Sequence, residues 1–415
     1  MQSIKLNDII DFNPKVKLEK SDPYSFIPME NITPDMKFVS DVEKKEWQGQ
    51  SSSKFENGDI LFARIYPCLD NRKIAVAKID GKGFGSTEFF VLRAKEGIAD
   101  QNFVYYLSKS DLIVQTAINS YVGASGRQRA DLKFIKNSQF NLPSYENQKK
   151  IAAILATYDD LIDVNKKRIT ILENIAEELY KEWFVRFRFP NWQNTEFEKG
   201  VPSEWNEVSL NDLGKIVTGK TPSLTVSEYH DGEYPFYKTP DMHNKVFVFN
   251  TEDSLTEYGL SSQKSQIIEE NSIMVTCIGT GGVTAISTKR GCTNQQINSI
   301  SLSDKDLLYW AFLTIRNLKP QIELFGATGT TMTNLSKGKF GRLLILRPSL
   351  DLIKEYQNIV EPIFDQIKSL GLNNANLIKQ KDVLLPRLIS GKLLVDHLDI
   401  QYPPSMQTSD EAEEK

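Results

Sequence analysis

The feature that most constrains this chain is an internal duplication. Leu6-Asn7-Asp8 recurs 204 residues later as Leu210-Asn211-Asp212, and Gly123-Ala124-Ser125-Gly126 recurs 203 residues later as Gly326-Ala327-Thr328-Gly329. Three further matches have offsets between 205 and 210 residues: Tyr24-Ser25-Phe26 with Tyr234-Pro235-Phe236, Thr33-Pro34-Asp35-Met36 with Thr239-Pro240-Asp241-Met242, and Pro143 with Pro348. Copies of about 205 residues are too long to be layers of a solenoid, so each is expected to be a domain with an appendage.

The appendage at the end of each copy is a long amphipathic helix. In the first copy, apolar residues recur three and four positions apart between residues 151 and 183, which is the spacing of one helix face. Asn165 lies in the same seven-residue row as Tyr158 and Leu172, and a polar residue on such a seam often fixes the pairing register. In the second copy we expect Pro386 to kink or end the helix and Gly391 to follow as a stop signal.

Two helices with apolar seams and no domain of their own must bury those seams. The simplest partner for each is the other, as an antiparallel coiled coil. The expected seam residues are Ile151, Leu155, Tyr158, Ile162, Asn165, Leu172 and Leu179 in the first helix and Ile363, Leu370, Leu377 and Leu384 in the second.

The segments before the helices have a mixed pattern. Short β-rich runs such as 60–63, 89–92, 273–275 and 343–346 alternate with short helical patterns such as 103–108. The fold class is therefore α+β, with a pseudo-twofold repeat of a globular segment and a long helix. The expected parts are a globular segment at 1–145, a helix at 146–190, a globular segment at 191–349, a helix at 350–391, and a tail at 392–415 that is acidic and disordered at its end.

Composition excludes several classes of protein. The chain has 40% hydrophobic and 25% charged residues, as soluble globular proteins do, and no run of 18 apolar residues that could span a membrane. Its first residues lack the apolar core of a signal peptide, and its 3 cysteines are scattered, so we expect a cytoplasmic protein. The net charge is −4, which is the sum of +3 for residues 1–150 and −7 for the remainder of the chain, where the long helices and the tail are acidic.

A search for catalytic motifs gives one weak candidate. Asp35, Glu43 and Lys45 have a PD…ExK arrangement, in which the carboxylates would hold Mg²⁺ and the lysine would orient a water. The second copy has Pro240-Asp241 but no Glu-x-Lys after it, so a turn is the simpler interpretation. The glycine-rich run 279–282 opens no helix and is weak as a dinucleotide site.

The combination of motifs resembles the specificity (S) subunit of type I restriction–modification enzymes. The resemblance is carried by residues 142–155 (LPSYENQKKIAAIL), 179–184 (LYKEWF), 219–223 (GKTPS) and 384–393 (LLPRLISGKL), in this order, and by the duplication. It covers essentially the full length of the chain.

This resemblance implies a DNA-reading, non-catalytic protein. The two globular segments would be target recognition domains, each reading half of a bipartite, asymmetric sequence in double-stranded DNA. Two modification subunits, which carry the adenine-N6 methyltransferase site and S-adenosylmethionine, and two restriction subunits, which use ATP and Mg²⁺, would assemble on the chain. No cofactor is expected in this chain, and no membrane contact.

The resemblance does not assign base contacts, so candidates come from side-chain chemistry. Arginine pairs with guanine, asparagine and glutamine pair with adenine, and hydroxyl groups and lysine bind phosphate or base edges. The expected DNA-binding residues are Arg64, Arg72, Lys73, Arg127, Gln128 and Arg129 in the first copy and Lys220, Lys238, Thr280, Asn294, Gln295, Gln296, Thr330, Thr331 and Asn334 in the second.

Two alternatives remain open from the residues alone. An interaction scaffold from a system without DNA could have the same two globular segments and helices. A self-contained nuclease would use Asp35, Glu43 and Lys45.

Overall fold

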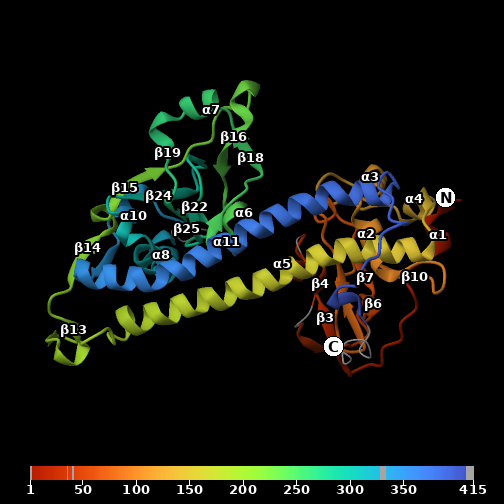
Figure 1. The fold of residues 1–415 in the computed structure, drawn as a ribbon, viewed down its shortest axis with the longest axis horizontal. Coiled ribbons are helices and arrows are strands. Elements are labelled where there is room, and N and C mark those ends of the chain that lie inside the picture. The colour runs from red at the N-terminus through yellow and green to blue at the C-terminus, as the bar shows by residue number, and fades with distance from the viewer. Residues whose placement is uncertain (1, 35, 40–41, 328–332, 408–415) are drawn as a thin grey trace. The chain divides into compact units, whose positions relative to one another are not determined.

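The computed structural model describes residues 2–34, 36–39, 42–327 and 333–407. The chain divides into two compact units: unit 1 comprises Met1–Val164 and Asn376–Lys415, and unit 2 comprises Asn165–Ala375. Two long helices, α5 (Tyr145–Tyr180) and α11 (Leu350–Ile389), each contribute one part to each unit (Figure 1). The units therefore differ from the expected division in chain order, because each globular segment packs with parts of both helices.

Unit 1 is built around a twisted sheet whose five described strands follow the order β2-β10-β7-β8-β4. These strands are β2 (Ile10–Phe12), β10 (Phe89–Ala94), β7 (Ile60–Ala63), β8 (Ile74–Ala77) and β4 (Phe38–Val39). Neighbours are antiparallel except β4 and β8, and Phe89 lies opposite Ala63. Every residue of β7 and β8 is buried, as expected for short apolar runs covered on both faces.

A second sheet of unit 1 has the described order β5-β3-β9-β6. Its strands are β5 (Lys44–Glu46), β3 (Pro23–Ile27), β9 (Lys82–Gly85) and β6 (Ser53–Glu56). A separate pair joins β1 (Gln2–Lys5) to β11 (Gln139–Leu142). The remaining short elements are the helices α1 (Leu6–Ile9), α2 (Gln101–Lys109), α3 (Asp111–Asn119) and α4 (Leu132–Lys136), and the 3-10 turns η1 (Met29–Asn31) and η8 (Pro404–Met406).

Unit 2 repeats both sheets strand for strand. Its larger sheet has the described order β15-β24-β20-β22-β17, and its smaller sheet has the order β18-β16-β23-β19. The strands are β15 (Gly214–Thr218), β24 (Ile297–Leu302), β20 (Ile273–Thr276), β22 (Thr284–Ser287), β17 (Phe247–Val248), β18 (Asp253–Leu255), β16 (His230–Tyr237), β23 (Gly291–Thr293) and β19 (Ile267–Ile268). The predicted duplication and the α+β class are thus confirmed.

Several further elements of unit 2 also have counterparts in unit 1, whereas α7 has none among the described helices of unit 1. The pair β14 (Asn206–Ser209) and β26 (Leu344–Arg347) matches β1 and β11. The helices are α6 (Thr239–Met242), α7 (Glu257–Ser261), α8 (Leu308–Asn317), α9 (Lys319–Gly326) and α10 (Lys337–Gly341). Leu6-Asn7-Asp8 and Leu210-Asn211-Asp212 both begin a short helical turn, whose aspartate accepts from the backbone N–H three residues earlier.

One proposed match of the duplication is out of register. Phe26 pairs with Phe84 in β9, as Phe236 pairs with Cys292 in β23. This register places Met29, not Thr33, at the position of Thr239, since three residues separate each from the paired phenylalanine. The shared letters Thr-Pro-Asp-Met therefore mark different positions, and Asp35 lies outside the described residues.

Each unit packs helices on its larger sheet to form a core. In unit 1, Phe103 and Tyr106 of α2 lie in one buried cluster with Phe62 and Phe90 of the sheet. In unit 2, Trp310 and other residues of α8 lie in a cluster with Ile273 and Ile300 of the sheet. Burial of such aromatic side chains contributes much of the hydrophobic stabilisation of a core.

The first long helix is fixed to unit 1 by Gln148, a residue of the sequence motif at its start. The Gln148 side chain is fully buried, donates from Nε2 to the Pro143 carbonyl oxygen at 3.1 Å, and accepts from the Asp100 N–H at 2.9 Å. Asp100 in turn accepts from the Phe103 N–H and caps α2. This motif residue therefore joins the starts of two helices.

Within each unit, the parts of α5 and α11 pair in antiparallel fashion. In unit 1, Lys381 Nζ contacts Asp159 Oδ1. In unit 2, Asn165 bonds to Asn374, and the Tyr356 hydroxyl donates to the Ala176 carbonyl oxygen at 3.1 Å. Residue numbers fall along one helix as they rise along the other, as the coiled-coil prediction required.

The most buried rows of the pair differ from some of the expected seam residues. Ile151, Leu155, Ile162 and Asn165 are buried, whereas the remaining seven expected residues are half-buried: Tyr158, Leu172, Leu179, Ile363, Leu370, Leu377 and Leu384. In α11 a neighbouring heptad row is the more buried one, and its members are Ile353, Val360, Ile367, Asn374 and Leu388. Asn374 and Lys381 interrupt this row with polar residues, so its pattern is weak in the sequence.

The prolines of the second helix are accommodated. Pro362 lies within α11, where it removes one backbone hydrogen bond, and the buried neighbours Val360 and Phe364 hold the helix in the core. Pro386 was expected to kink or end the helix, and α11 ends three residues later at Ile389. Gly391 follows with a φ of 71°, a left-handed conformation that glycine adopts readily.

The tail packs onto unit 1 as far as it is described. The Ser405 N–H donates to Asp160 Oδ2 at 3.0 Å, and Met406 contacts the core cluster. The expected disordered end, 408–415, lies outside the described residues. Among the helices of the described ranges, none is both long and apolar enough to cross a membrane.

Candidate nucleic-acid interface

The structure joins the two arginine-bearing loops of unit 1. Ile65, which follows β7, forms a β-bridge with Arg129. The Tyr66 N–H donates to the Gln128 carbonyl oxygen at 2.9 Å, and the Ala130 N–H donates to that of Arg64 at 2.8 Å. The expected DNA-binding residues Arg64, Gln128 and Arg129 are therefore brought together at one end of the sheet.

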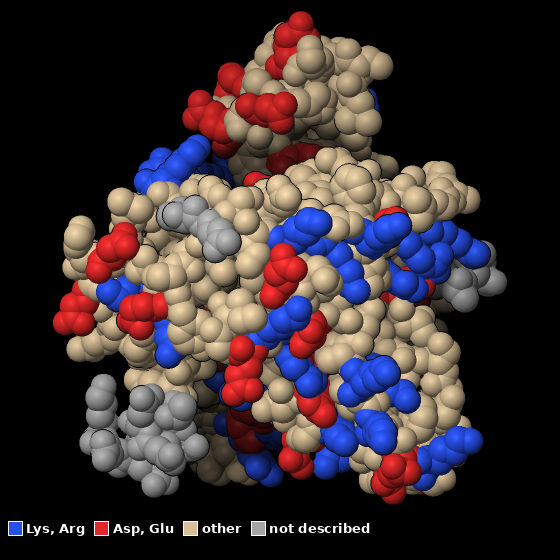
Figure 2. Space-filling model, turned by 90° about the vertical axis from the view of Figure 1, so that its right-hand side faces the viewer, with Lys and Arg blue, Asp and Glu red and all other residues tan. Residues whose placement is uncertain are grey.

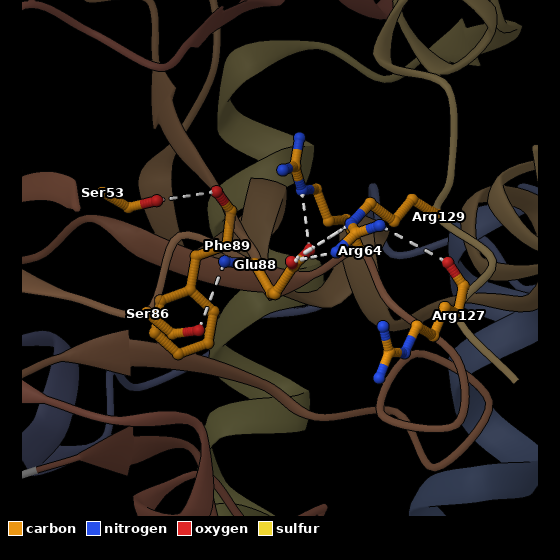
Figure 3. A network of polar contacts seen from close by, with 7 residues as sticks. All are labelled: Ser53, Arg64, Ser86, Glu88, Phe89, Arg127 and Arg129. Atoms are coloured by element: carbon orange, nitrogen blue, oxygen red, sulfur yellow. Dashed lines mark hydrogen bonds and ion pairs between the residues drawn. The ribbon is translucent and has the colours of Figure 1, made fainter. Parts of the chain in front are cut away.

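A carboxylate that the sequence motifs did not single out lies at the centre of this site. Glu88, just before β10, accepts from Arg64 Nε at 3.1 Å. It also accepts from Arg129 Nε at 2.9 Å and from Arg129 Nη2 at 2.7 Å. Figure 3 shows the three side chains converging from three segments, with the terminal nitrogens of Arg64 directed away from Glu88.

Electrostatics keep this carboxylate ionised. Hydrogen bonds from Arg129, and then from Arg64, lower the pKa of Glu88 against the opposing effect of its partial burial. The side chain of Glu88 is 19% exposed, and those of Arg64 and Arg129 are 32% and 43% exposed. The site therefore presents an acceptor between two cationic donors at a partly open surface.

Arg127 lies beside this cluster and is exposed. Its N–H donates to the Ala124 carbonyl oxygen at 3.0 Å, and Gly123 and Gly126 have φ values of 114° and 79°. These two left-handed positions explain why the turn contains glycines at its two ends.

Two expected residues of unit 1 point elsewhere. Arg72 donates from Nη1 to the Lys109 carbonyl oxygen at 2.7 Å and forms an ion pair with Asp111. Lys73 donates from Nζ to the Met29 carbonyl oxygen at 3.2 Å. These contacts hold the loop after β7 onto α2, α3 and the 3-10 turn η1, so the structure does not bring Arg72 and Lys73 into the cluster.

Unit 2 has the same framework at the same place. Its two loops form the short pair β21 (Ile278–Gly279) and β25 (Thr333–Asn334), which matches the Ile65–Arg129 bridge. The Leu335 N–H donates to the Cys277 carbonyl oxygen at 2.8 Å, as Ala130 does to Arg64. Asn334 thus takes the place of Arg129, and Cys277 takes the place of Arg64.

The polar run Asn294–Gln296 lies next to this pair. Gln296 Oε1 accepts from Thr239 Oγ1 at 3.3 Å and from Asn294 Nδ2 at 3.1 Å. Gln295 Oε1 accepts from Thr221 Oγ1 at 2.7 Å and is exposed. The structure therefore brings the amides of this run together with two threonine hydroxyls.

The other expected residues of unit 2 are placed less uniformly. Thr280 and Lys220 are exposed, and the Lys220 N–H donates to the Thr293 carbonyl oxygen beside the run. Lys238 Nζ pairs with Asp253 at 2.7 Å and with Glu252 at 3.2 Å. Thr330 and Thr331 lie outside the described residues.

Strand register identifies Glu88 and Gln296 as equivalent positions. The Arg64 N–H donates to the Glu88 carbonyl oxygen at 3.0 Å, and the Cys277 N–H donates to that of Gln296 at 2.7 Å. Each residue also donates its own N–H to the side chain two residues earlier, to Ser86 at 3.2 Å and to Asn294 at 3.1 Å. The sequence signal that could have found Glu88 is its place directly before the apolar run 89–92, as Gln296 directly precedes β24.

The residues of the nuclease alternative form local contacts. Lys45 Nζ pairs with Glu43 at 3.1 Å and lies 4.3 Å from the ring centroid of Phe26. Asp35 is outside the described residues. Within the ranges that the structure describes, no group of three or more His, Cys, Asp and Glu side chains could hold a metal ion.

Figure 2 shows how charge is distributed over one side of the molecule. Lys and Arg side chains form several groups, with Asp and Glu side chains between them. Any nucleic-acid contact on this side would involve particular residues rather than a uniformly basic surface.

The duplicated α+β units and the paired long helices define a class of protein with two equivalent globular domains in one chain. Sequence comparison identifies the family. Residues 1–174 and 202–380 match the family described as the type I restriction modification DNA specificity domain. The chain belongs to this family, as the resemblance of its motifs predicted.

Two relatives and one solved structure agree with this assignment. The chain is 28% identical over 411 residues to the type I restriction enzyme HindI specificity subunit of Haemophilus influenzae, covering 84% of this chain and 89% of the relative. It is 28% identical over 318 residues to the MjaIX specificity subunit of Methanocaldococcus jannaschii, covering 73% and 71%. The S subunit of a type I system from M. genitalium has the same fold, with a TM-score of 0.52, 15% identity, and coverage of 94% and 96%.

Proposed function

We propose that this chain is the non-catalytic DNA-recognition subunit of a type I restriction–modification complex. Unit 1 and unit 2 each read one half of a bipartite, asymmetric target in double-stranded DNA. The observation that carries this proposal is the pair of equivalent loop sites, which share a backbone framework and differ in their side chains. Two sites with the same backbone framework but different polar side chains suit two domains that each bind a different half-site.

The long helices serve in this proposal as the attachment sites for the catalytic subunits. In unit 1, Leu161 and Val164 of α5 are 48% and 52% exposed, and in unit 2, Ile171 and Ile175 are 59% and 50% exposed. Residues three and four positions apart lie on one face of a helix. Apolar side chains at this exposure suit burial by a partner protein.

The complete complex contains two modification and two restriction subunits in the cytoplasm. The modification subunits supply S-adenosylmethionine and the adenine-N6 methyltransferase site, into which they flip the target base. The restriction subunits supply the ATP- and Mg²⁺-dependent steps. This chain contributes the choice of sequence.

The proposal is tested by reading adenine methylation in cells. Host DNA is sequenced by a single-molecule method that detects methyladenine, with the modification subunit expressed alone or together with this chain. We expect methylation at a split motif only when both proteins are present. Methylation that is independent of this chain, or none in the presence of both folded proteins, would contradict the proposal.

A variant pair tests the attachment surface separately. Ile171→Glu with Ile175→Glu changes two exposed positions, so the fold is expected to persist while co-purification with the modification subunit falls at least about 10-fold. The matched control, Thr170→Glu, introduces the same charge at an exposed position of the same helix that is neither three nor four residues from Ile171 or Ile175 and so lies on a different face. Unchanged co-purification of the double variant would contradict the proposed surface.

A further inference from the structure

We infer that position 88 of unit 1 and its equivalent, position 296 of unit 2, determine which base pair each half-site must contain. Glu88 and Arg64 together read a C·G pair, and Gln296 reads an A·T pair. The inference rests on the proposed function and adds to it the residue and the base chemistry in each unit.

The backbone at these two positions is the same to the level of individual hydrogen bonds. In both units the residue directly precedes the strand that pairs with the end of β7 or β20. In both, the carbonyl oxygen of this residue accepts from the N–H of the first residue after β7 or β20, and its own N–H donates to a side chain two residues earlier. The exposure pattern of the three-residue turn, intermediate then exposed then intermediate, is identical in 86–88 and 294–296.

The side chains at this shared framework are not the same. Unit 1 has the ionic group Arg64–Glu88–Arg129, and unit 2 has Cys277, Gln296 and Asn334 at the equivalent places. If the ion pairs served only to hold the two loops together, unit 2 would need a substitute for them. Unit 2 keeps the loop pairing through β21 and β25 without these charges. The side chains are therefore free to differ for another purpose, and in a DNA reader that purpose is base selection.

The chemistry of Glu88 selects cytosine. An ionised carboxylate only accepts hydrogen bonds, so it suits the N4 amine of cytosine and repels the acceptors of guanine and thymine. Arg129 donates hydrogen bonds to Glu88 from Nε and Nη2 and so positions its carboxylate. Arg64 uses Nε for Glu88, and Figure 3 shows its terminal nitrogens directed away. These donors suit O6 and N7 of the paired guanine.

The chemistry of Gln296 selects adenine. An amide both donates and accepts, which matches N7 and the N6 amine of adenine in the major groove. In the free protein, Gln296 Oε1 accepts from Thr239 Oγ1 at 3.3 Å and from Asn294 Nδ2 at 3.1 Å, which uses both of its lone pairs. The adenine N6 amine therefore replaces the longer bond, from the Thr239 hydroxyl, while the bond from Asn294 keeps the amide oriented before and after DNA binds. Such preorganisation lowers the entropic cost of recognition.

The test exchanges the two side chains within the full-length protein. The variants Glu88→Gln and Gln296→Glu are each assembled with the modification subunit, and the methylated motif is read by single-molecule sequencing. Glu88→Gln should lower discrimination at one C·G position of one half-site by at least about 10-fold. Gln296→Glu should do the same at one A·T position of the other half-site and shift its preference toward C·G.

A matched control and a binding assay keep the outcome clear. Glu96→Gln removes an exposed carboxylate of unit 1 outside the site and should leave the motif unchanged. Competition binding to duplexes that carry each base pair at each motif position reads selectivity even where a variant methylates poorly. If Glu88→Gln does not fold, as judged by its thermal unfolding, Gln296→Glu tests the same rule independently.

The results that overturn the inference differ from those that overturn the proposed function. If the wild-type complex methylates a split motif and both folded variants retain its base preferences, the assignment of these two positions is wrong. It is equally wrong if Glu88→Gln alters both half-sites or only positions without a C·G pair. If the wild-type complex has no motif at all, the proposed function itself fails.

Discussion

Asn165 donates a hydrogen bond from Nδ2 to Asn374 Oδ1 at 2.9 Å, inside the apolar seam between α5 and α11 of unit 2. Both side chains are at least nine-tenths buried. A buried amide pair adds little to stability but penalises every register in which one amide faces an apolar side chain. The pair therefore specifies the alignment of the two helices.

This relationship predicts an asymmetry between single and double substitutions. Asn165→Leu leaves the Asn374 amide buried without a partner, so the free energy of unfolding should fall by about 1–3 kcal/mol. Adding Asn374→Leu removes that orphaned group and should restore most of the loss. Urea unfolding of the two single variants and the double variant measures the coupling. The control is Asn373→Leu at an exposed position; a double variant with additive losses would refute the pairing.

A second prediction concerns the ion pair between the same helices in unit 1. Asp159 is 8% exposed, contacts Lys381 Nζ through Oδ1, and accepts from the Tyr106 hydroxyl at 2.6 Å. Lys381→Met leaves a buried carboxylate without its cation, so the free energy of unfolding should fall by about 3–5 kcal/mol. Lys379→Met, at an exposed position of the same helix, should change it by less than about 0.5 kcal/mol. Equal effects of the two substitutions would show that the ion pair is not important.

Much of the architecture could be predicted because it depends on local or periodic patterns. The β-rich runs 60–63 and 273–275 and the long helices all follow from residues close in the chain. The seam row of α11 was harder, because Asn374 and Lys381 satisfy their polar groups with partners on the other helix. A polar residue in an apolar row looks like a break in the pattern until its partner is known.

The sequence named some residues of the candidate site but not Glu88, because the contacts of Glu88 depend on how distant segments pair in the fold. Arg64 and Arg129 could be named because arginine suits guanine and phosphate in any context. Glu88 lies 24 residues from Arg64 and 41 from Arg129, so only the strand register shows that one carboxylate faces both. Arg72 and Lys73 show the converse case: neighbouring carbonyl groups hold both side chains, and a sequence does not reveal such contacts.

The contrast between Arg127 and Arg72 gives a third prediction. Arg127 is exposed in the glycine turn, whereas Arg72 is held by the Lys109 carbonyl and Asp111. If Arg127 contacts a phosphate, Arg127→Ala should lower DNA affinity for all sequences. It should also make the slope of log affinity against log salt concentration shallower by about 1, the value for one phosphate contact. Arg72→Ala should leave both quantities unchanged. Binding of the assembled complex at two salt concentrations measures this, and equal losses for the two variants would contradict the distinction.

The fourth prediction uses Lys37, a buried cation without a hydrogen-bond partner among the described residues. Lys37 is 5% exposed, and its Nζ lies 4.9 Å from the ring centroid of Phe38 and 5.4 Å from that of Tyr106. Burial lowers the pKa of Lys37 from 10.5 to about 8, against the opposing effect of Asp159. The folded state therefore binds fewer protons than the unfolded state between about pH 8 and 10.5, and this group makes the protein more stable as pH rises through that window.

Replacing Lys37 by methionine removes a charge whose burial costs stability at neutral pH. We expect Lys37→Met to raise the free energy of unfolding at pH 7 by about 1–3 kcal/mol, and the gain should shrink as the pH approaches 10. Lys78→Met is the matched control, because Lys78 is exposed and its Nζ lies 5.4 Å from the same Phe38 ring centroid. Thermal unfolding of the three proteins at pH 7 and pH 9.5 measures both effects. A loss of stability in Lys37→Met at pH 7, or a gain that does not depend on pH, would show that burial of the Lys37 charge does not destabilise the folded state.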